Sequence, residues 1–394
     1  MYTFGIIGLA RSGIAAARKL QRLGHTAFLS DSRPASAIAE SAELQANFPC
    51  EFGGHTECLL DCRTIIVSPG VPLNIPILQA ASQRGIELIS EIELGFRLKA
   101  ADSSIIAVTG SNGKSTTVSL IHHLLTQAGV KVLLAGNIGS AFTAAPVEEP
   151  GTDVFVLELS SFQLELIDRF HPRVSVLLNI TPDHLNRYPD MNAYARAKFN
   201  IFRNQTREDL AVLNEDDPYG WKFSHKLKSR LGFFSLQPNG IFRYNGSSIN
   251  YQDAEFSLEH LPLRGPHNHA NIMAALLAVS DYKINNDLLK QALASFQPLP
   301  HRLETVAQVR GITFINDSKA TNTDSVRYAL QSFPRRIRLI MGGAGKGEDY
   351  RVLNNLLATR AEKVYLTGDS QKEMSEAFSG VVELASFPDI AAAV

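Results

Sequence analysis

Several features that mark specialised proteins are scarce or absent in this sequence. Its 394 residues include only three cysteines, which argues against a disulfide-built secreted domain and fits a reducing compartment. The net charge is −1 and no block of like charges occurs, so neither a nucleic acid nor an anionic membrane surface is indicated as a partner. No long apolar stretch and no basic leader precede the first strand-like segment. We therefore expect a cytoplasmic protein, a monomer, whose partners are small molecules.

The length and the residue pattern indicate several α/β domains. At ~150 residues per domain the chain is long enough for two or three, and 45% hydrophobic with 20% charged residues is typical of a globular protein. Short apolar strands alternate with helical patterns along the whole chain, which predicts parallel sheets. The predicted domains are residues 1–98, 99–298 and 299–394.

A glycine-rich segment after residue 108 predicts a phosphate-binding loop. It follows the apolar run 105–108 and precedes a helical pattern that extends to Ala128. Gly110 and Gly113 allow a tight turn, Lys114 supplies a positive charge, and a hydroxyl can bind Mg²⁺. Val108 stands where the general pattern has glycine, so the loop is a shortened variant. A bare helix start would not explain a lysine followed by three hydroxyl residues. The predicted ATP-binding residues of this loop are Gly110, Ser111, Asn112, Gly113, Lys114, Ser115 and Thr116.

The first hundred residues have the layout of a dinucleotide-binding unit. Residues 5–13 form a glycine-rich turn between a strand and a helix, and Asp31 ends the next strand about twenty residues later. The glycine spacing is not GxGxxG, which argues against a nicotinamide cofactor. A pyrophosphate-bearing sugar nucleotide would use the same helix start, and a nucleotide-type fold without a ligand is the alternative. Ser68 and Gly70 follow another strand and are expected to face the same crevice.

Three strands of the middle region end in polar residues. Asn137, Glu158 and His184 each follow an apolar strand-like run. Because parallel strands bring their carboxyl ends to one edge of a sheet, these side chains are expected near Lys114, where Mg²⁺ and a second substrate would meet a triphosphate. Each residue alone is more often a satisfied polar group, but three converging strand ends favour a functional role.

Two further patterns lie before residue 280. Residues 232–251 indicate short antiparallel strands with a turn at Asn245-Gly246. Asn268 and Asn271 then open an alanine-rich helix and share one face of its first turn, where they could hydrogen-bond a nucleotide. Helix capping explains Asn268 equally well.

Taken in order, the segments TGSNGKST, ELSSFQLE, NITPDHL, HNHANIMAA, PHRLE, NDSKATN and MGGAGKG closely resemble the ATP-dependent Mur ligases of peptidoglycan synthesis. ELSSFQLE, GIIGLARSG and SPGVP resemble the branch of that family that adds D-glutamate. The resemblance implies an N-terminal Rossmann-like domain, a central P-loop ATPase-like domain and a C-terminal Rossmann-like domain. It implies D-glutamate addition to UDP-N-acetylmuramoyl-L-alanine through an acyl phosphate, with release of ADP and phosphate.

The resemblance also implies a charge-rich site with two Mg²⁺ ions. Ser115 and Glu158 would hold one, and His184 with Lys198 the second, where Lys198 carries a CO2-derived carbamate. Carbamylation would turn a cationic side chain into an anionic oxygen ligand. The implied catalytic set is Lys114, Glu158, His184, Lys198 and Lys346.

The remaining roles implied by the resemblance concern substrate binding. ATP would be held, besides the loop, by Asn268, Asn271, Arg302 and Asp317. The UDP-sugar would be held by Leu9, Ala10, Ser12, Asp31, Ser32, Arg33, Ser68, Gly70, Asn137 and His184. The incoming amino acid would be held by Lys319, Thr321 and Lys346.

One departure from the family concerns the C-terminus. Members of the family continue past the last helix of this chain into a strand and a Ser- and Phe-containing segment that helps to bind D-glutamate, so the third domain is expected to be incomplete. A related ligase that adds another amino acid, including L-glutamate, and a catalytically weak nucleotide-binding form are the alternatives. Folylpolyglutamate synthetase is disfavoured because about a hundred residues of sugar-nucleotide-like domain precede the phosphate loop.

Overall fold

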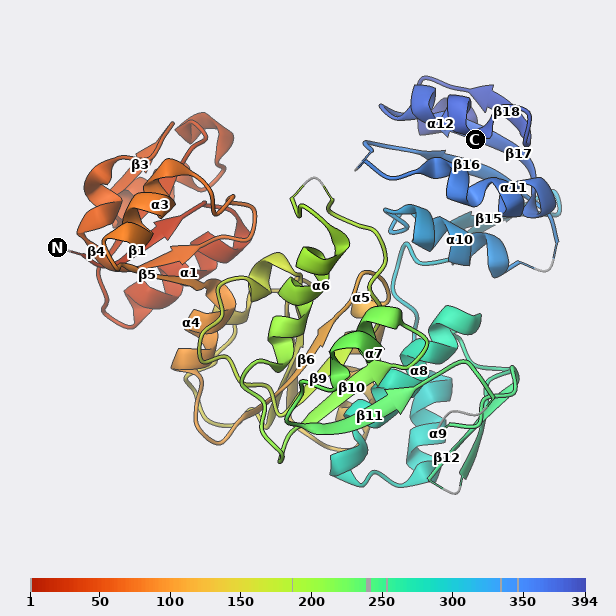
Figure 1. Cartoon of the computed structure of the whole chain (residues 1–394), viewed down its shortest axis with the longest axis horizontal. Helices are drawn as coiled ribbons and strands as arrows, with labels where there is room; N and C mark the ends of the chain where they lie inside the picture. Colours follow the sequence, from red (N-terminus) through yellow and green to blue (C-terminus); the bar gives the residue numbers. More distant parts are fainter. Residues whose placement is uncertain (1, 186, 239–241, 253, 334, 346) are drawn as a thin grey trace.

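The computed structural model describes residues 2–394 except 186, 239–241, 253, 334 and 346. It has three α/β domains, each with its own sheet, arranged so that the central domain lies between the other two (Figure 1). This is the predicted fold class. The predicted limits at 98/99 and 298/299 stay a prediction, and each falls between two of these sheets.

The first domain is a five-stranded parallel sheet in the order β3-β2-β1-β4-β5. Its strands β2 and β4 are buried over most of their length because helices cover both faces. Strand and helix bounds are β1 Tyr2–Ile7, α1 Arg11–Arg22, β2 Ala27–Asp31, α2 Ser41–Asn47, β3 Cys50–Phe52, β4 Cys62–Val67, α3 Pro76–Gln83, β5 Glu87–Ser90 and α4 Glu91–Leu98.

The central domain is a six-stranded parallel sheet in the order β11-β10-β9-β6-β8-β7. Two apolar clusters cover its faces, one with α5, α8 and α9 and the other with α6. The bounds are β6 Ser104–Thr109, α5 Lys114–Gln127, β7 Val132–Gly136, β8 Val154–Glu158, β9 Val174–Leu177, α6 Met191–Phe199, β10 Leu210–Asn214, α7 Pro218–Ser224, β11 Arg230–Phe234, β12 Ser248–Tyr251, β13 Ala254–Ser257, α8 Pro266–Ala278 and α9 Asn286–Ser295.

The prediction for residues 232–251 is partly wrong. Strand β11 does not start an antiparallel hairpin but pairs in parallel with β10 at the edge of the central sheet. The antiparallel pair is β12 with β13, after the Asn245-Gly246 turn. The Asn245 side chain accepts backbone N–H groups of Ser247 and Ser248, so this turn is formed locally.

The third domain contains an antiparallel pair, β14 with β15, and a separate three-stranded parallel sheet in the order β16-β17-β18. Its apolar cluster lies around β17, α11 and α12. The first pair is open to solvent, with Val306, Val309 and Ile312 more than half exposed. The bounds are β14 Glu304–Val309, β15 Ile312–Asn316, α10 Thr323–Gln331, β16 Ile337–Gly342, α11 Asn354–Arg360, β17 Ala361–Thr367, α12 Gln371–Phe378, β18 Glu383–Ser386 and α13 Ile390–Ala393.

In the described part of the chain, none of the helices combines the length and the apolar character needed to cross a bilayer.

Candidate active site

The phosphate loop connects β6 to α5 at the middle of the central sheet. Gly110 and Gly113 have φ angles of 156° and 85°, so the loop uses backbone conformations that favour glycine. Lys114 begins α5, and its ammonium group donates to the carbonyls of Gly110 and Ser111 at 2.8 Å each. The lysine thus lies over the loop whose N–H groups would receive phosphate oxygens.

Helix α8 packs directly against this loop. A Cβ atom at Gly113 would lie 2.4 Å from Oδ1 of Asn271, closer than real contacts allow. Asn271 also donates to Oδ1 of Asn268 at 3.2 Å, and Asn268 donates to the carbonyl of Arg264 at 2.8 Å. The predicted pair therefore lies at the phosphate loop, with Asn271 nearer to it.

Two predicted strand-end residues meet beside the loop. Asn137 after β7 donates its side-chain N–H to Oε1 of Glu158 at 2.8 Å, and Glu158 ends β8. The Glu158 side chain is buried, and its Oε2 atom has no hydrogen-bond partner among the described residues. A buried carboxylate oxygen without a donor is costly unless a cation or donor completes it, so this atom indicates a binding position.

Lys198, on α6, is buried under the loop. Its Nζ atom donates to the Gly110 carbonyl at 2.8 Å and lies 4.7 Å from the centre of the Tyr194 ring. Burial, reinforced by the charge of Lys114, holds the pKa of Lys198 well below its usual value, although Asp183 and Glu158 oppose the shift. The site therefore favours a neutral amine at this position.

His184 follows β9 in a left-handed backbone conformation, with φ of 56°. Its Nε2 atom lies 3.6 Å from Asp183, and its ring lies 4.8 Å from the Phe162 ring, centre to centre. Arg187, which the sequence analysis did not select, pairs with Glu165 at 2.6 Å and donates to the Val71 carbonyl of the first domain at 3.3 Å. No local sequence signal marks this long-range contact.

No group of three or more His, Cys, Asp or Glu side chains that could hold a metal occurs within the described residues. The expected Mg²⁺ ligands therefore form no ready-made acidic or histidine cluster. The polar groups here come from different residue types, namely a serine, a glutamate, a histidine and a lysine.

A cavity of about 860 Å³ lies between the central and third domains, beside the phosphate loop. Arg302 enters from the interdomain segment and donates to the Ser115 hydroxyl at 3.0 Å. His267 of α8 and Tyr328 of α10 also border the cavity, and their rings lie 5.2 Å apart. The predicted ATP-binding residues in its lining are Asn112, Gly113, Thr116, Asn268, Asn271, Arg302 and Asp317.

The residues predicted to hold the amino acid are less closely grouped. Lys319 lines the same cavity and is exposed. Thr321 is exposed on the turn before α10. Lys346 lies outside the described residues.

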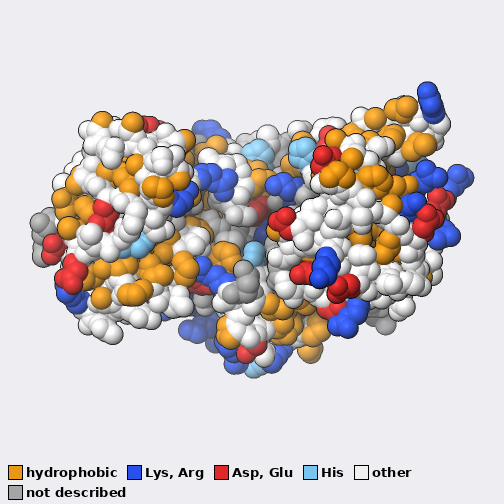
Figure 2. All heavy atoms as spheres, turned by 90° about the horizontal axis from the view of Figure 1, so that it is seen from above, with side chains coloured by type: hydrophobic (Ala, Val, Ile, Leu, Met, Phe, Trp, Pro, Cys, Tyr) orange, Lys and Arg blue, Asp and Glu red, His pale blue; other side chains and the backbone are white. Residues whose placement is uncertain are grey.

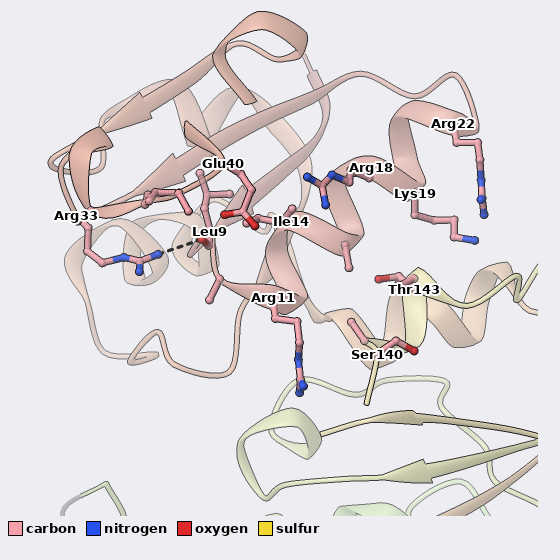
Figure 3. Close-up of a pocket in the computed structure, with 17 residues that line it drawn as sticks. Leu9, Arg11, Ile14, Arg18, Lys19, Arg22, Arg33, Glu40, Ser140 and Thr143 are labelled. Carbon is pink, nitrogen blue, oxygen red and sulfur yellow. Dashed lines mark hydrogen bonds between the residues drawn. The ribbon is translucent and has the colours of Figure 1, made fainter. Parts of the chain in front are cut away.

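A second cavity, of about 620 Å³, extends along α1 from its start to Arg22, between the first and central domains (Figure 3). Of the predicted UDP-sugar residues, Leu9, Ala10 and Arg33 line it, whereas Ser12, Asp31, Ser32, Ser68, Gly70, Asn137 and His184 do not. Arg11, which the sequence analysis did not select, also lines it. The N-cap residue of α1, Ala10, makes no side-chain cap hydrogen bond, so this helix start is suited to an anion.

Asp31 and Ser68 shape the glycine turn at this cavity. The Asp31 carboxylate accepts the Leu9 N–H at 2.6 Å and pairs with Arg33 at 2.9 Å. Burial would raise the pKa of Asp31, but the hydrogen bonds from Arg33 and Leu9 hold it below its usual value. The Ser68 hydroxyl donates to the Gly8 carbonyl at 2.6 Å.

The two cavities lie on either side of the central domain, and Figure 2 shows histidine, lysine and arginine side chains along the hollow between the outer domains. The arrangement can hold one anionic ligand at α1 and another at the phosphate loop, and the Asn137–Glu158 pair is contacted from the α1 side by Arg11.

Three family models match the chain in succession. They are described as "Mur ligase MurD-like, N-terminal domain" over residues 3–90, "Mur ligase middle domain" over 108–279, and "Mur ligase, glutamate ligase domain" over 301–394.

Curated relatives agree with these matches. The chain is 41% identical to UDP-N-acetylmuramoylalanine--D-glutamate ligase of Salinibacter ruber, with 95% of this chain and 85% of that protein covered. It is 39% identical to the enzyme of the same name from Acidobacterium capsulatum, with 96% and 84% covered.

Solved structures share the fold. The UDP-N-acetylmuramate-alanine ligase of Thermotoga maritima matches with a TM-score of 0.62 at 20% identity, covering 99% of this chain and 91% of that one. The MurF ligase of Thermotoga maritima, solved in complex with ADP, matches with a TM-score of 0.65 at 18% identity, covering 92% and 86%.

Proposed function

The chain belongs to the Mur ligase family, and we propose from this premise how its own residues join D-glutamate to UDP-N-acetylmuramoyl-L-alanine. It is an ATP-dependent ligase of peptidoglycan precursor synthesis. The assignment of roles is supported above all by one observation. Asn137, Glu158 and Lys198 lie together at the phosphate loop.

ATP occupies the 860 Å³ cavity, with its phosphates at the loop between β6 and α5. Backbone N–H groups of the loop and the Lys114 ammonium receive phosphate oxygens. Asn268, Asn271, Arg302 and Asp317 hold the nucleotide from α8 and from the third domain side.

The UDP end of the sugar substrate lies at the start of α1, at the 620 Å³ cavity. Asn137 and His184 hold the muramoyl-alanine end, which reaches the phosphate loop. The alanine carboxylate attacks the γ-phosphorus of ATP, so that ADP leaves and an acyl phosphate forms. The amine of D-glutamate then attacks the acyl carbon, and inorganic phosphate leaves. Lys114 and Arg302 lower the barrier by neutralising charge on the transferring group.

The residues present fit Mg²⁺, because Glu158 offers a buried oxygen without a partner among the described residues. Ser115 and Glu158 would hold one ion, and His184 with Lys198 would hold the second. Bound Mg²⁺ supplies charge neutralisation for the phosphate groups.

Lys198 fits a carbamate because a neutral amine, not an ammonium ion, can add CO2. Its burial and the nearby Lys114 favour that neutral form. The product would be an anionic oxygen ligand on a helix that otherwise presents an amine to the loop.

Lys319, Thr321 and Lys346 would bind the carboxylates of D-glutamate from the third domain. We further propose domain limits at 1–98, 99–298 and 299–394, a monomer, a cytoplasmic location, and small-molecule substrates without a nucleic-acid or membrane partner.

Calorimetric binding tests the substrate assignment independently of turnover. UDP-N-acetylmuramoyl-L-alanine should bind more tightly than the same compound without alanine, because only the former reaches Asn137 and His184. A product assay with D-glutamate, L-glutamate and other amino acids then tests the acceptor. Equal binding of both UDP compounds, or exclusive use of another amino acid, would contradict the proposal.

Substitution of Lys198 tests the carbamate. Lys198→Ala should lower the turnover by about 100-fold or more, since the site loses a charged ligand, and small carboxylic acids or high bicarbonate should restore part of it. Lys222→Ala, which removes an exposed helical lysine, is the matched control. Full activity of Lys198→Ala would refute the role.

A further inference from the structure

We propose that Arg11 is a positioning residue for this reaction, which sets the orientation of Asn137 from the neighbouring domain. The inference rests on the proposed function of the α1 cavity and of Asn137. It assigns a role to a side chain that lies inside the GIIGLARSG segment but was not among the predicted site residues.

Arg11 is the first residue of α1, and its side chain leaves the first domain toward the central domain (Figure 3). Its guanidinium group donates to the carbonyls of Gly136, Asn137 and Gly139 at 3.1, 2.9 and 3.0 Å. One side chain of the first domain thus binds three backbone carbonyls of a single turn more than 120 residues away.

The turn that Arg11 contacts has a constrained backbone. Gly136 has φ of 104°, and a Cβ atom there would lie 2.4 Å from the Glu158 carbonyl oxygen. The Asn137 N–H donates to that same carbonyl at 2.8 Å, and the Asn137 side chain donates to Oε1 of Glu158 at 2.8 Å. Arg11 binds the opposite, carbonyl side of the turn, so it fixes the direction in which the Asn137 amide points.

The residue type suits the task. A guanidinium group has five N–H donors in a planar fork and can bind several carbonyls at once, whereas lysine presents a single nitrogen. The ion pairs of α1 with the central domain, from Lys19 and Arg22 to Glu148 at 2.5 and 2.7 Å, lie farther along the helix and do not involve this turn.

Arg11 therefore links the two ends of the sugar substrate. The UDP end would bind at the start of α1, where Arg11 begins, and the muramoyl-alanine end would bind at Asn137, where its guanidinium group ends. Loss of Arg11 should leave the binding of the UDP end intact and should displace Asn137, which binds the muramoyl-alanine end.

Calorimetry on the whole chain measures the affinities for the two ends of the substrate separately. In the wild type, the affinity gained on going from UDP to UDP-N-acetylmuramoyl-L-alanine reports the contacts of the muramoyl-alanine part. Arg11→Ala should reduce that gain about tenfold and change UDP affinity less than about twofold, a difference of about 1.4 kcal/mol in one ligand only. Arg11→Lys should restore part of it.

A double-mutant cycle shows whether the effect passes through Asn137. Asn137→Ala should reduce the gain by itself, and Arg11→Ala should then have no further effect. Glu148→Gln, which weakens the ion pairs that Glu148 makes with Lys19 and Arg22 of α1, should leave the gain unchanged. Thermal unfolding confirms that each variant is folded, and Arg11→Gln replaces Arg11→Ala if the latter does not fold.

The possible failures are distinguishable. A wild type that binds neither compound contradicts the proposed function itself. If Arg11→Ala weakens UDP as much as the full substrate, Arg11 contacts the diphosphate and the positioning role is overturned. Additive effects of Arg11→Ala and Asn137→Ala, or an equal loss in Glu148→Gln, overturn it as well.

Discussion

The first and third domains contact the central domain through different kinds of group. At the first interface, the fully buried Glu93 carboxylate of α4 accepts the N–H groups of Asp168, Arg169 and Phe170 at 2.9, 3.0 and 2.9 Å. Buried Lys19 adds an ion pair with Glu148. These groups lie outside the proposed catalytic set.

At the third interface, the contacts come from the phosphate loop itself. The Asn112 side chain accepts from Asn322 at 3.0 Å and from Ser325 at 2.8 Å, and it donates to Asp324 at 3.0 Å. All three partners lie at the start of α10. In the same region, Arg302 donates a hydrogen bond to the Ser115 hydroxyl.

This difference predicts that the first and central domains form a fixed unit and that the third domain responds to the nucleotide. In the proposed function, ATP binds where Asn112 and Ser115 make these contacts, so its binding must rearrange them, whereas the contacts of Glu93 can stay as they are. The first and central domains should therefore keep one arrangement through the reaction, and the third domain should change position with the nucleotide.

Removal of Glu93 should break the first interface and give the largest effect. Glu93→Ala leaves three backbone N–H groups without their acceptor and removes one of the carboxylates that pair with Arg97, so we expect a loss of about 3–5 kcal/mol in the free energy of unfolding. Urea unfolding measures it. Glu87→Ala, which removes a more exposed partner of the same arginine, should cost less than about 1 kcal/mol. Similar losses in both variants would show that the buried carboxylate is not what holds the first domain.

Low pH should destabilise the contact between the central and third domains, because it protonates His267, whose ring contacts Tyr328. Burial, with the charges of His269 and Arg302, lowers the pKa of His267 to about 4, while Asp324 opposes the shift. The unfolded chain, with a histidine pKa of about 6.5, therefore binds the proton more readily. Stability is fully present above about pH 6.5 and falls as the pH decreases toward 4, by roughly 3 kcal/mol.

Urea unfolding of the wild type and of His267→Gln at pH 7 and pH 4.5 measures this contribution. The variant should lose less stability than the wild type over that interval. His260→Gln removes an exposed histidine and serves as the control. An unchanged pH dependence in His267→Gln would place the acid sensitivity elsewhere.

Removal of Asn322 should give the smallest loss of stability and should measure what the hydrogen bond between Asn322 and Asn112 contributes. Its side chain caps α10 by accepting the Ser325 N–H at 2.8 Å and also donates to Asn112. Asn322→Ala should therefore cost about 2 kcal/mol, half from the cap and half from the interdomain bond. Asn285→Ala removes only a cap, at α9, and should cost about 1 kcal/mol. Equal costs would mean that the bond to Asn112 contributes nothing.

The fold class was predictable because parallel strands buried on both faces leave a strong local pattern. Strand β8, with five buried residues in VFVLE, is an example. Within residues 232–251 the prediction failed at β11, since the pairing of β11 with β10 depends on a neighbour in space and not on the alternation of the segment.

Among the predicted site residues, Asn137 and Glu158 meet because β7 and β8 are neighbours in the sheet, as converging strand ends predict. Arg11 and Arg187 could not be selected in this way. Each is a surface-type residue that donates to a backbone carbonyl more than 100 residues away, and a single sequence does not reveal which distant segments lie together in space. The roles of the site residues stay predictions until the variants above are measured.

The contact between Gly113 and Asn271 has a consequence for inhibitors. Any side chain at position 113 would both demand a disfavoured backbone conformation and strike the amide of Asn271. A single substitution of Gly113 therefore cannot reshape this part of the proposed nucleotide cavity without disturbing the loop. A compound that binds in contact with Gly113 and Asn271 should therefore select few resistance substitutions at position 113.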